Sequence, residues 1–211
     1  MADIVTYMFE DAFKTELITL NIDEDIIQKL WSEIASAYTA PGRYYHNLSH
    51  LDKLVETVFP IRNEIEDWKA LIFSIGYHDI VYNPLEKDNE ARSAEIAYER
   101  LTSLDFPLSL PGKCKQQILA TKHHQMSEDP DTDYFIDADL SVLGSDRETY
   151  LNYTKQIRKE YQDLPDLIYR PGRKKLLEHF LEMKCIFKTK YFQDMYEDQA
   201  RTNISGELQL L

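Results

Sequence analysis

Apolar side chains recur at intervals of three and four residues along most of this chain, a spacing that places them on one face of an α-helix. In residues 23–38 a single apolar stripe carries the repeat: Ile26, Ile27, Leu30, Trp31, Ile34 and Tyr38. Only 6 Gly and 8 Pro interrupt the 211 residues, and no convincing β-hairpin pattern appears. The sequence therefore predicts an all-α fold, a compact helical bundle.

The expected helices are separated by proline, glycine and short polar loops. We expect roughly eight of them: the clear stretches are 23–38, 47–58, 65–76, 88–104, 111–125, 146–161, 173–187 and 194–208, and 134–143 is an ambiguous addition. The stretch 134–143 has the composition of a short strand, but it lies between helical patterns, and we interpret it as a helix. The length of 211 residues favours one domain over two.

The net charge of the chain limits its partners. At −13 the average surface repels phosphate backbones, so we do not expect a long nucleic acid and we expect a small substrate instead. The first residues are acidic where a signal peptide would be basic, and no apolar run approaches the ~18 residues that a membrane span needs. We therefore expect a cytoplasmic protein with no membrane partner, and whether it forms a homodimer stays open.

Two histidines four residues apart stand in the segment Arg43–His50, which reads RYYHNLSH. His46 and His50 would share one helix face if the helix has begun by His46, and both could then act on one bound group. A histidine on an amphipathic helix is more often a hydrogen-bonded core residue. Both interpretations stay open on the spacing alone.

Acidic residues appear in two windows that are otherwise apolar. His78 and Asp79 follow the apolar run 71–77 at the expected end of a helix. Asp137 and Asp139 stand among Phe, Ile, Leu and Val. Because a buried carboxylate needs a partner, at least one acid in each window should be paired, capping a helix or bound to metal.

Taken in order, His50, His78, Asp79 and Asp139 resemble the H…HD…D pattern of the HD-domain metal-dependent phosphohydrolases. The segment YHNLSH is similar to the YHNxxH motif of cyclic-nucleotide phosphodiesterases, and ADLS at 138–141 is similar to a segment of the same enzymes. The resemblance covers roughly residues 44–143 and is greatest to small bacterial-type HD phosphohydrolases. It implies a helical fold in which these four residues bind a divalent metal and His46 acts as the general acid.

The resemblance divides the chain into a metal-site core at about 44–143 and a helical tail at 146–211. Within the core, His124 follows Thr121 in a T-x-x-H pattern and is similar to the extra histidines that bind a second metal in some HD proteins. Glu90 is expected near metal-bound water, although an acid at a helix start also favours the helix dipole. Further expected contacts to a phosphorylated substrate are Arg43, Asn89, His123 and Arg158.

The expected function is hydrolysis of a small phosphate ester, a nucleotide or a related phosphomonoester or phosphodiester. After Asp79 the residues IVYNP depart from the phosphodiesterase pattern, so cyclic-nucleotide hydrolysis is not implied. The ligand set suits one or two ions of Mn, Fe, Co, Ni, Zn or Mg. The alternatives are a di-iron oxygenase of the HD fold, which iron content and oxygen uptake would reveal, and a non-catalytic metal-binding helical protein, which would turn over no phosphate ester.

Overall fold

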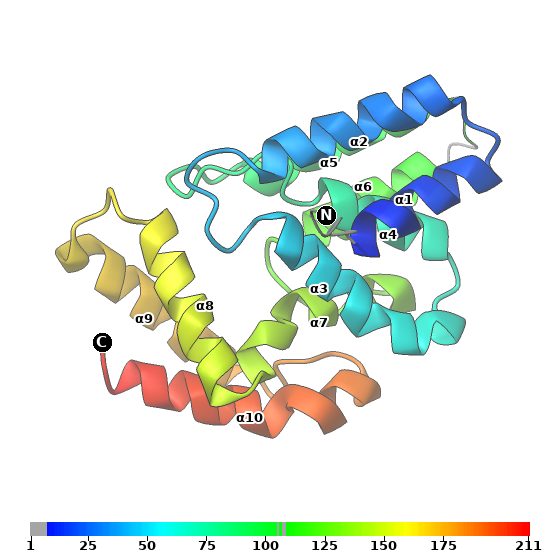
Figure 1. Ribbon diagram of the computed structural model, residues 1–211. Helices are drawn as coiled ribbons and strands as arrows, with labels where there is room; N and C mark the ends of the chain where they lie inside the picture. The colour runs from blue at the N-terminus through cyan, green and yellow to red at the C-terminus, as the bar shows by residue number, and fades with distance from the viewer. Residues whose placement is uncertain (1–7, 105, 107–108) are drawn as a thin grey trace, which may run out of the picture.

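A computed structural model describes residues 8–104, 106 and 109–211, and Figure 1 shows their arrangement. The elements in chain order are α1 (Met8–Thr19), α2 (Glu24–Tyr38), α3 (Leu48–Val58), the 3₁₀ helix η1 (Phe59–Glu64), α4 (Trp68–Tyr77), α5 (Asn89–Thr102), α6 (Ser109–Ala120), α7 (Pro130–Leu140), the 3₁₀ helix η2 (Ser141–Gly144), α8 (Arg147–Glu160), α9 (Asp166–Glu182) and α10 (Lys190–Leu208). These described residues contain no strand, which confirms the all-α prediction.

The stretch 134–143, which has the composition of a strand but was predicted to be a helix, is helical. It forms the end of α7 and most of η2. Asp129 begins α7 by accepting a hydrogen bond from the backbone N–H of Thr132, and Pro130 occupies the first helical position. The capping residue explains why the helix starts before the apolar window does.

Helix α1 was missing from the sequence prediction, and α9 starts earlier than predicted. In α1 the residues Phe9, Phe13 and Leu17 are buried at four-residue spacing, so the helical stripe was present but short. Helix α9 continues through Pro171, which normally ends or kinks a helix because it lacks a backbone N–H. Because proline and glycine usually end helices, Pro171 and Gly172 led to a predicted start at residue 173, after the first turns of α9.

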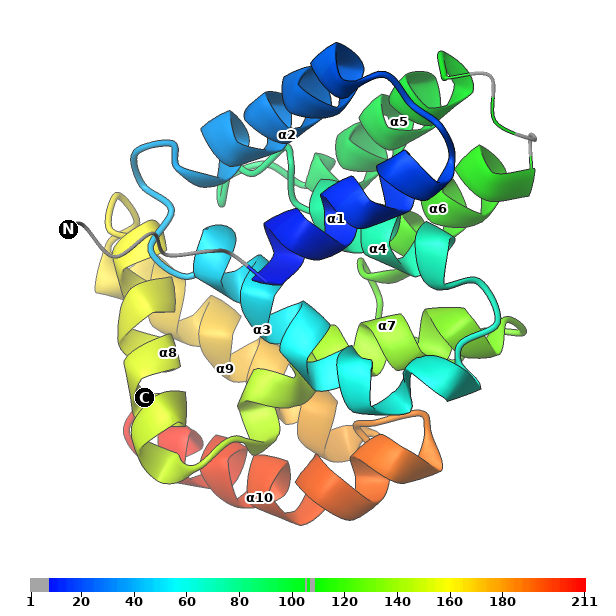
Figure 2. The same ribbon diagram turned by 45° about the vertical axis from the view of Figure 1, so that its right-hand side comes forward.

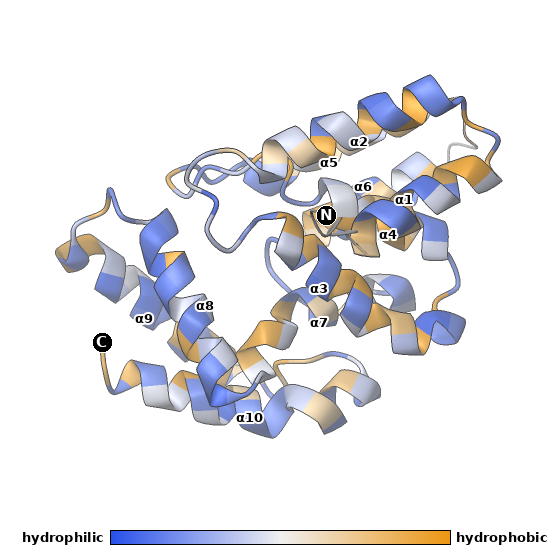
Figure 3. Cartoon of the chain, in the orientation of Figure 1, coloured by the Kyte–Doolittle hydropathy of each residue, from blue (hydrophilic) through white to orange (hydrophobic). Residues whose placement is uncertain are grey.

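Helix α4 lies at the centre of the first group of helices. Residues 70–77 are all buried, and the part of α4 that is visible in Figure 3 is coloured as hydrophobic. Helices α1 and α2 pack on it at Gly76, where an added Cβ would lie 2.7 Å from the ring of Phe9 and 3.1 Å from Ile34. No described helix combines the length and the apolar character that crossing a bilayer demands.

Helices α8, α9 and α10 form a second group on the other side of α3 and α7 (Figures 1 and 2). The start of α10 is held by Asp137, whose carboxylate accepts hydrogen bonds of 2.7 Å from the backbone N–H groups of Lys188 and Thr189. The Thr189 hydroxyl donates a third bond of 2.8 Å. Asp137 therefore joins α7 to α10.

The backbone of α10 also lies directly on η2. An added Cβ at Gly144 would lie 2.5 Å from the backbone oxygen of Tyr196, and Asn203 donates to the carbonyls of Leu143 and Ser145 at 2.9 and 2.8 Å. Two backbones this close leave no space for a side chain, so only glycine fits at position 144.

We expect Gly144→Ala to lower the free energy of unfolding by about 1–3 kcal/mol, because the methyl group forces α10 away from η2. Urea unfolding followed by circular dichroism would measure the loss. Gly112→Ala is the matched control, since nothing lies within 4 Å of an added Cβ there and alanine favours its helix. Equal stability of the two variants would contradict the close packing.

Candidate metal centre

Two histidines from different helices face each other in the interior. His50 lies in the first turn of α3 and His78 follows the last residue of α4, and both are buried. Their Nε2 atoms are 3.3 Å apart. Atoms that each bind one ion at about 2.1 Å are separated by a similar distance, so this spacing is that of two ligands of a single metal.

The ring orientation of His78 is fixed by the backbone. Its Nδ1 lies 2.9 Å from the carbonyl oxygen of Ile75, and because a carbonyl can only accept, Nδ1 carries the hydrogen. The other ring nitrogen, Nε2, is then the atom that faces His50. A hydrogen bond on the second ring nitrogen is the usual arrangement of a metal-binding histidine.

Two carboxylates complete the cluster, which we call the His-Asp centre: His50, His78, Asp79 and Asp139. Asp139 Oδ1 lies 3.3 Å from His50 Nε2 and 3.8 Å from His78 Nε2, and Asp79 Oδ2 lies 3.2 Å from His78 Nε2. Ligand atoms of His50, His78 and Asp139 all lie within 4.8 Å of one another. Asp79 adjoins this triad through His78.

The carboxylates of the His-Asp centre favour a positive charge between them. Burial opposes a charge on His78, but the carboxylates of Asp79 and Asp139 outweigh it and raise the pKa of His78 to about 9. Burial lowers the pKa of His50. Against the opposing effect of burial, the neighbouring His78 holds the pKa of the Asp79 carboxyl well below its usual range. Two ionised carboxylates beside two imidazoles, with little solvent, fit a divalent cation in their midst.

His124 lies on the same pocket as the His-Asp centre, whereas its neighbour His123 is exposed. The chain leaves α6 at Ala120, and His124 adopts the left-handed conformation with φ 48°, which turns its ring inward. Its Nδ1 is buried and has no hydrogen-bond partner. Burial lowers the pKa of His124 to about 4, so the ring is neutral and carries a free lone pair.

Glu90, in the first turn of α5, lines this pocket as well. Its Oε2 is buried without a hydrogen bond, and the nearest cation, Lys122 Nζ, lies 3.5 Å away. Glu90 Oε2 therefore has an ion-pair partner but no hydrogen bond. Glu90 and His124 thus place two buried atoms without hydrogen bonds on the wall of the pocket.

His46 does not lie on the same helix as His50, because α3 starts only after the capping residue Asn47. The two histidines therefore do not share a helix face. His46 nevertheless reaches the centre: its Nδ1 lies 2.7 Å from Glu160 Oε2, and its Nε2 lies 3.8 Å from Asp79 Oδ2. The ring bridges the tail helix α8 and the His-Asp centre.

Glu160 was not found from the sequence. At the end of α8, its Oε1 accepts the backbone N–H groups of Tyr44, Tyr45 and His46 at 2.8, 2.7 and 2.9 Å. Its Oε2 also accepts from the hydroxyl of Tyr82 at 2.7 Å. A buried glutamate that lies 78 to 116 residues from its partners in the sequence carries no local pattern. This one carboxylate holds the loop that positions His46.

We expect Glu160 to make the stability of the protein sensitive to acid. Burial alone would raise its pKa, but the hydrogen bond from His46 and the other donors lower it from 4.5 to about 2. Because the folded-state pKa is depressed, the stabilisation is complete above pH 4.5 and is lost as the pH falls toward 2. Urea unfolding at a series of pH values should show this loss.

In Glu160→Gln the acid-dependent part should shrink, and the free energy of unfolding at neutral pH should fall by about 2–3 kcal/mol. The exposed Glu182→Gln is the control and should retain the acid dependence of the unaltered protein. Identical pH profiles for Glu160→Gln and Glu182→Gln would contradict the role of Glu160.

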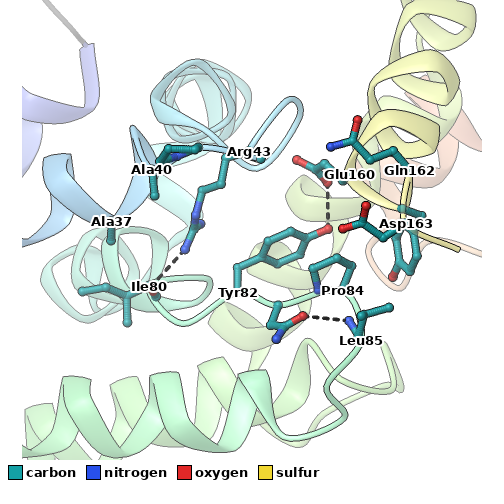
Figure 4. Close-up of a pocket in the computed structure, with 14 residues that line it drawn as sticks. Ala37, Ala40, Arg43, Ile80, Tyr82, Pro84, Leu85, Glu160, Gln162 and Asp163 are labelled. Atoms are coloured by element: carbon teal, nitrogen blue, oxygen red, sulfur yellow. Dashed lines mark hydrogen bonds between the residues drawn. The ribbon is translucent and has the colours of Figure 1, made fainter.

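Arg43 is occupied by backbone carbonyls rather than directed at the His-Asp centre. Its guanidinium donates to His46 O at 3.2 Å and to Ile80 O at 3.0 Å, and it lies over the rings of Tyr38 and Tyr82. Figure 4 shows Arg43 and the hydrogen bond from Tyr82 to Glu160 in a separate pocket of about 330 Å³. Arg43 therefore secures the loop before α3.

Of the four expected substrate contacts, Asn89 alone lines the pocket of the His-Asp centre. It exchanges hydrogen bonds with the backbone of Asn83 at 3.1 and 2.8 Å, which fixes the loop before α5. Arg158 pairs with Asp166 at 2.8 Å and donates to the carbonyl of Tyr161 at 2.7 Å, away from the pocket. The prediction that Arg43, His123 and Arg158 line the substrate pocket is therefore wrong.

The His-Asp centre opens into a pocket of about 580 Å³, a volume typical of small-molecule sites. His46, Glu90 and His124 line this pocket together with three members of the centre, His78, Asp79 and Asp139. Helices α8 and α9 of the tail supply the opposite wall. The predicted catalytic residues and all the predicted metal ligands except His50 therefore line one cavity.

Comparison of the chain with protein-family models, with curated proteins and with solved structures finds no match.

Proposed function

We propose that this protein is a metal-dependent hydrolase of phosphate esters, with the His-Asp centre as its metal site. The observation that carries the proposal is the buried pair of Nε2 atoms from His50 and His78, 3.3 Å apart and flanked by Asp79 and Asp139, beside a ligand-sized pocket. The resemblance of these four residues to the HD phosphohydrolase pattern supports the same function.

The residues of the centre fit a divalent cation by donor type and by charge. Two imidazole nitrogens and two carboxylates suit Mn, Fe, Co, Ni or Zn, and Mg to a smaller degree. A divalent ion bound there would supply Lewis-acid polarisation of the phosphoryl oxygen and would activate water as the nucleophile. The chain itself contributes preorganisation, since Ile75 fixes the tautomer of His78 before any ligand arrives.

His46 is the proposed general acid. Glu160 accepts the hydrogen of Nδ1, so Nε2 is the atom that faces the pocket. Burial opposes protonation, but the hydrogen bond with Glu160 and the charge of Asp79 raise the pKa of His46 above its ordinary value. The raised pKa favours a proton at Nε2, which His46 would donate to the oxygen of the leaving alcohol when the P–O bond breaks.

His124 and Glu90 are the proposed donors for a further cation in the same pocket, because each has a buried atom without a hydrogen bond. We expect His124→Ala to contain less metal per chain than the unaltered protein while keeping the ion at the His-Asp centre. Elemental analysis after gel filtration measures this content. His123→Ala is the matched control, since that side chain is exposed, and equal loss in both variants would contradict the assignment.

The function is tested by elemental analysis of the purified protein followed by a substrate screen with Mn²⁺ or the metal found. The screen covers nucleoside mono-, di- and triphosphates, cyclic nucleotides, sugar phosphates and aryl phosphates, with Asp79→Ala as the inactive control. Release of phosphate or alcohol that Asp79→Ala loses supports the proposal. Bound metal with no turnover of any ester would favour a non-catalytic role, and bound iron with oxygen uptake would favour an oxygenase.

A further inference from the structure

One wall of the pocket beside the His-Asp centre is apolar and comes from the tail. Residues at four-residue spacing along and just before α9 line it: Leu164, Ile168, Gly172, Leu176 and Phe180. The first turn of α9 is hydrophobic in Figure 3. Because residues four apart lie on one face of a helix, α9 presents a continuous apolar stripe to the cavity.

Part of this stripe is exposed to solvent although it faces a cavity. Ile168 is 59% exposed and Leu176 is 45% exposed. At the far end, the buried ring of Phe180 lies 6.3 Å from that of His124, centroid to centroid, so the stripe extends to the predicted metal ligands. Apolar side chains that line a cavity and remain accessible gain free energy when an apolar ligand covers them.

The cations of the pocket are already paired. Arg173 makes a two-pronged ion pair with Glu207, with N···O distances of 2.8 and 3.1 Å, and it is buried. Lys122 donates to the carbonyl of Lys87 at 2.5 Å and lies 3.5 Å from Glu90. Lys122 and Arg173 are the Lys and Arg residues among those that line the pocket, so neither is available to bind a second phosphate group.

From the apolar stripe and the paired cations we infer that the pocket takes a monophosphate ester whose alcohol portion is uncharged and largely apolar, with the phosphate at the His-Asp centre and the apolar body against α9. This inference rests on the proposed function for the position of the phosphate. A sugar or nucleoside would place hydroxyl groups or base edges against Ile168, Leu176 and Phe180, which offer no side-chain hydrogen bond. Such a substrate would lose hydrogen bonds to water without replacement.

Gly172 provides a sharp test because it stands in the middle of the stripe. Nothing lies within 4 Å of a Cβ added at this position, so a larger side chain would extend into the cavity without a clash. A side chain also suits the helix better than glycine does. Gly172→Leu should therefore fold and should fill the space that the apolar body occupies.

The experiment measures binding of phosphonates, whose P–C bond ester hydrolysis does not cleave, to the Mn²⁺-loaded protein by isothermal titration calorimetry. We expect 2-naphthylmethylphosphonate to bind on the order of 10- to 100-fold more tightly than methylphosphonate, from the apolar area that it buries. Gly172→Leu should lose most of this preference. Gly112→Leu, at the helical glycine of α6 with equally open surroundings and outside this pocket, should keep it.

Equal affinity for the two phosphonates, or tighter binding of adenosine 5′-phosphonate than of the naphthyl compound, would overturn the inference. An unchanged preference in Gly172→Leu would overturn it too, because the apolar body would then lie elsewhere. The binding result is independent of turnover. If no ester is hydrolysed but the naphthyl preference and its loss in Gly172→Leu are seen, the hydrolase proposal fails and the inferred site stands.

Discussion

Asp139→Ala is expected to lose its metal and to reduce phosphate ester hydrolysis by roughly 10³-fold or more, since a bound divalent ion contributes several kcal/mol to such reactions. Asp139 Oδ1 faces both imidazoles of the His-Asp centre, at 3.3 Å from His50 Nε2 and 3.8 Å from His78 Nε2. The helical circular dichroism spectrum should survive, because removing one of two neighbouring carboxylates relieves repulsion in the metal-free protein. Elemental analysis and a phosphate-release assay measure the two losses.

Asp137→Ala is the matched control, two residues earlier on the same helix. Its carboxylate accepts three hydrogen bonds from Lys188 and Thr189 at the start of α10, so we expect a loss of stability of about 3 kcal/mol with the metal retained. Comparison of the two variants distinguishes a carboxylate that binds metal from one that only stabilises the fold. The same metal content in both variants, or metal loss in Asp137→Ala alone, would show that the assignment is shifted by two residues.

The sequence was informative where function or packing leaves a local pattern. The apolar repeat of α2 is such a pattern, because a helix buries one face against the core. The convergence of the His-Asp centre was implied by the resemblance of its four residues to the HD phosphohydrolase pattern. The short stripe of α1 was missed since it had no proline or glycine to mark its start.

The remaining parts of the site depend on contacts between distant segments. Glu160 reaches the loop 44–46 from the end of α8, and the choice of His124 over His123 depends on one backbone angle, φ 48° at His124. Arg43 was expected at the substrate because it is a cation beside a candidate motif. Its actual partners are carbonyl oxygens, which no sequence pattern reveals, since every residue has one.

His46→Asn is expected to keep the metal and to lower turnover of esters with poor leaving groups by roughly 10²–10⁴, the usual contribution of a general acid. His46 Nε2 lies 3.8 Å from Asp79 Oδ2, while Nδ1 is held by Glu160 at 2.7 Å. Asparagine can still reach Glu160 by a hydrogen bond but has no proton to give. Metal analysis and steady-state kinetics on an alkyl phosphate measure the effect.

The choice of leaving group separates the acid role of His46 from a structural one. The p-nitrophenolate of an aryl phosphate departs with little protonation, so its release should fall only mildly in His46→Asn while cleavage of the alkyl ester is nearly lost. Glu160→Gln should lower the turnover of both esters by smaller factors than His46→Asn does. It leaves the imidazole of His46 in place and only loosens its orientation. Equal losses on the two esters with the metal intact would remove His46 from the acid role, and loss of the metal would make His46 a ligand instead.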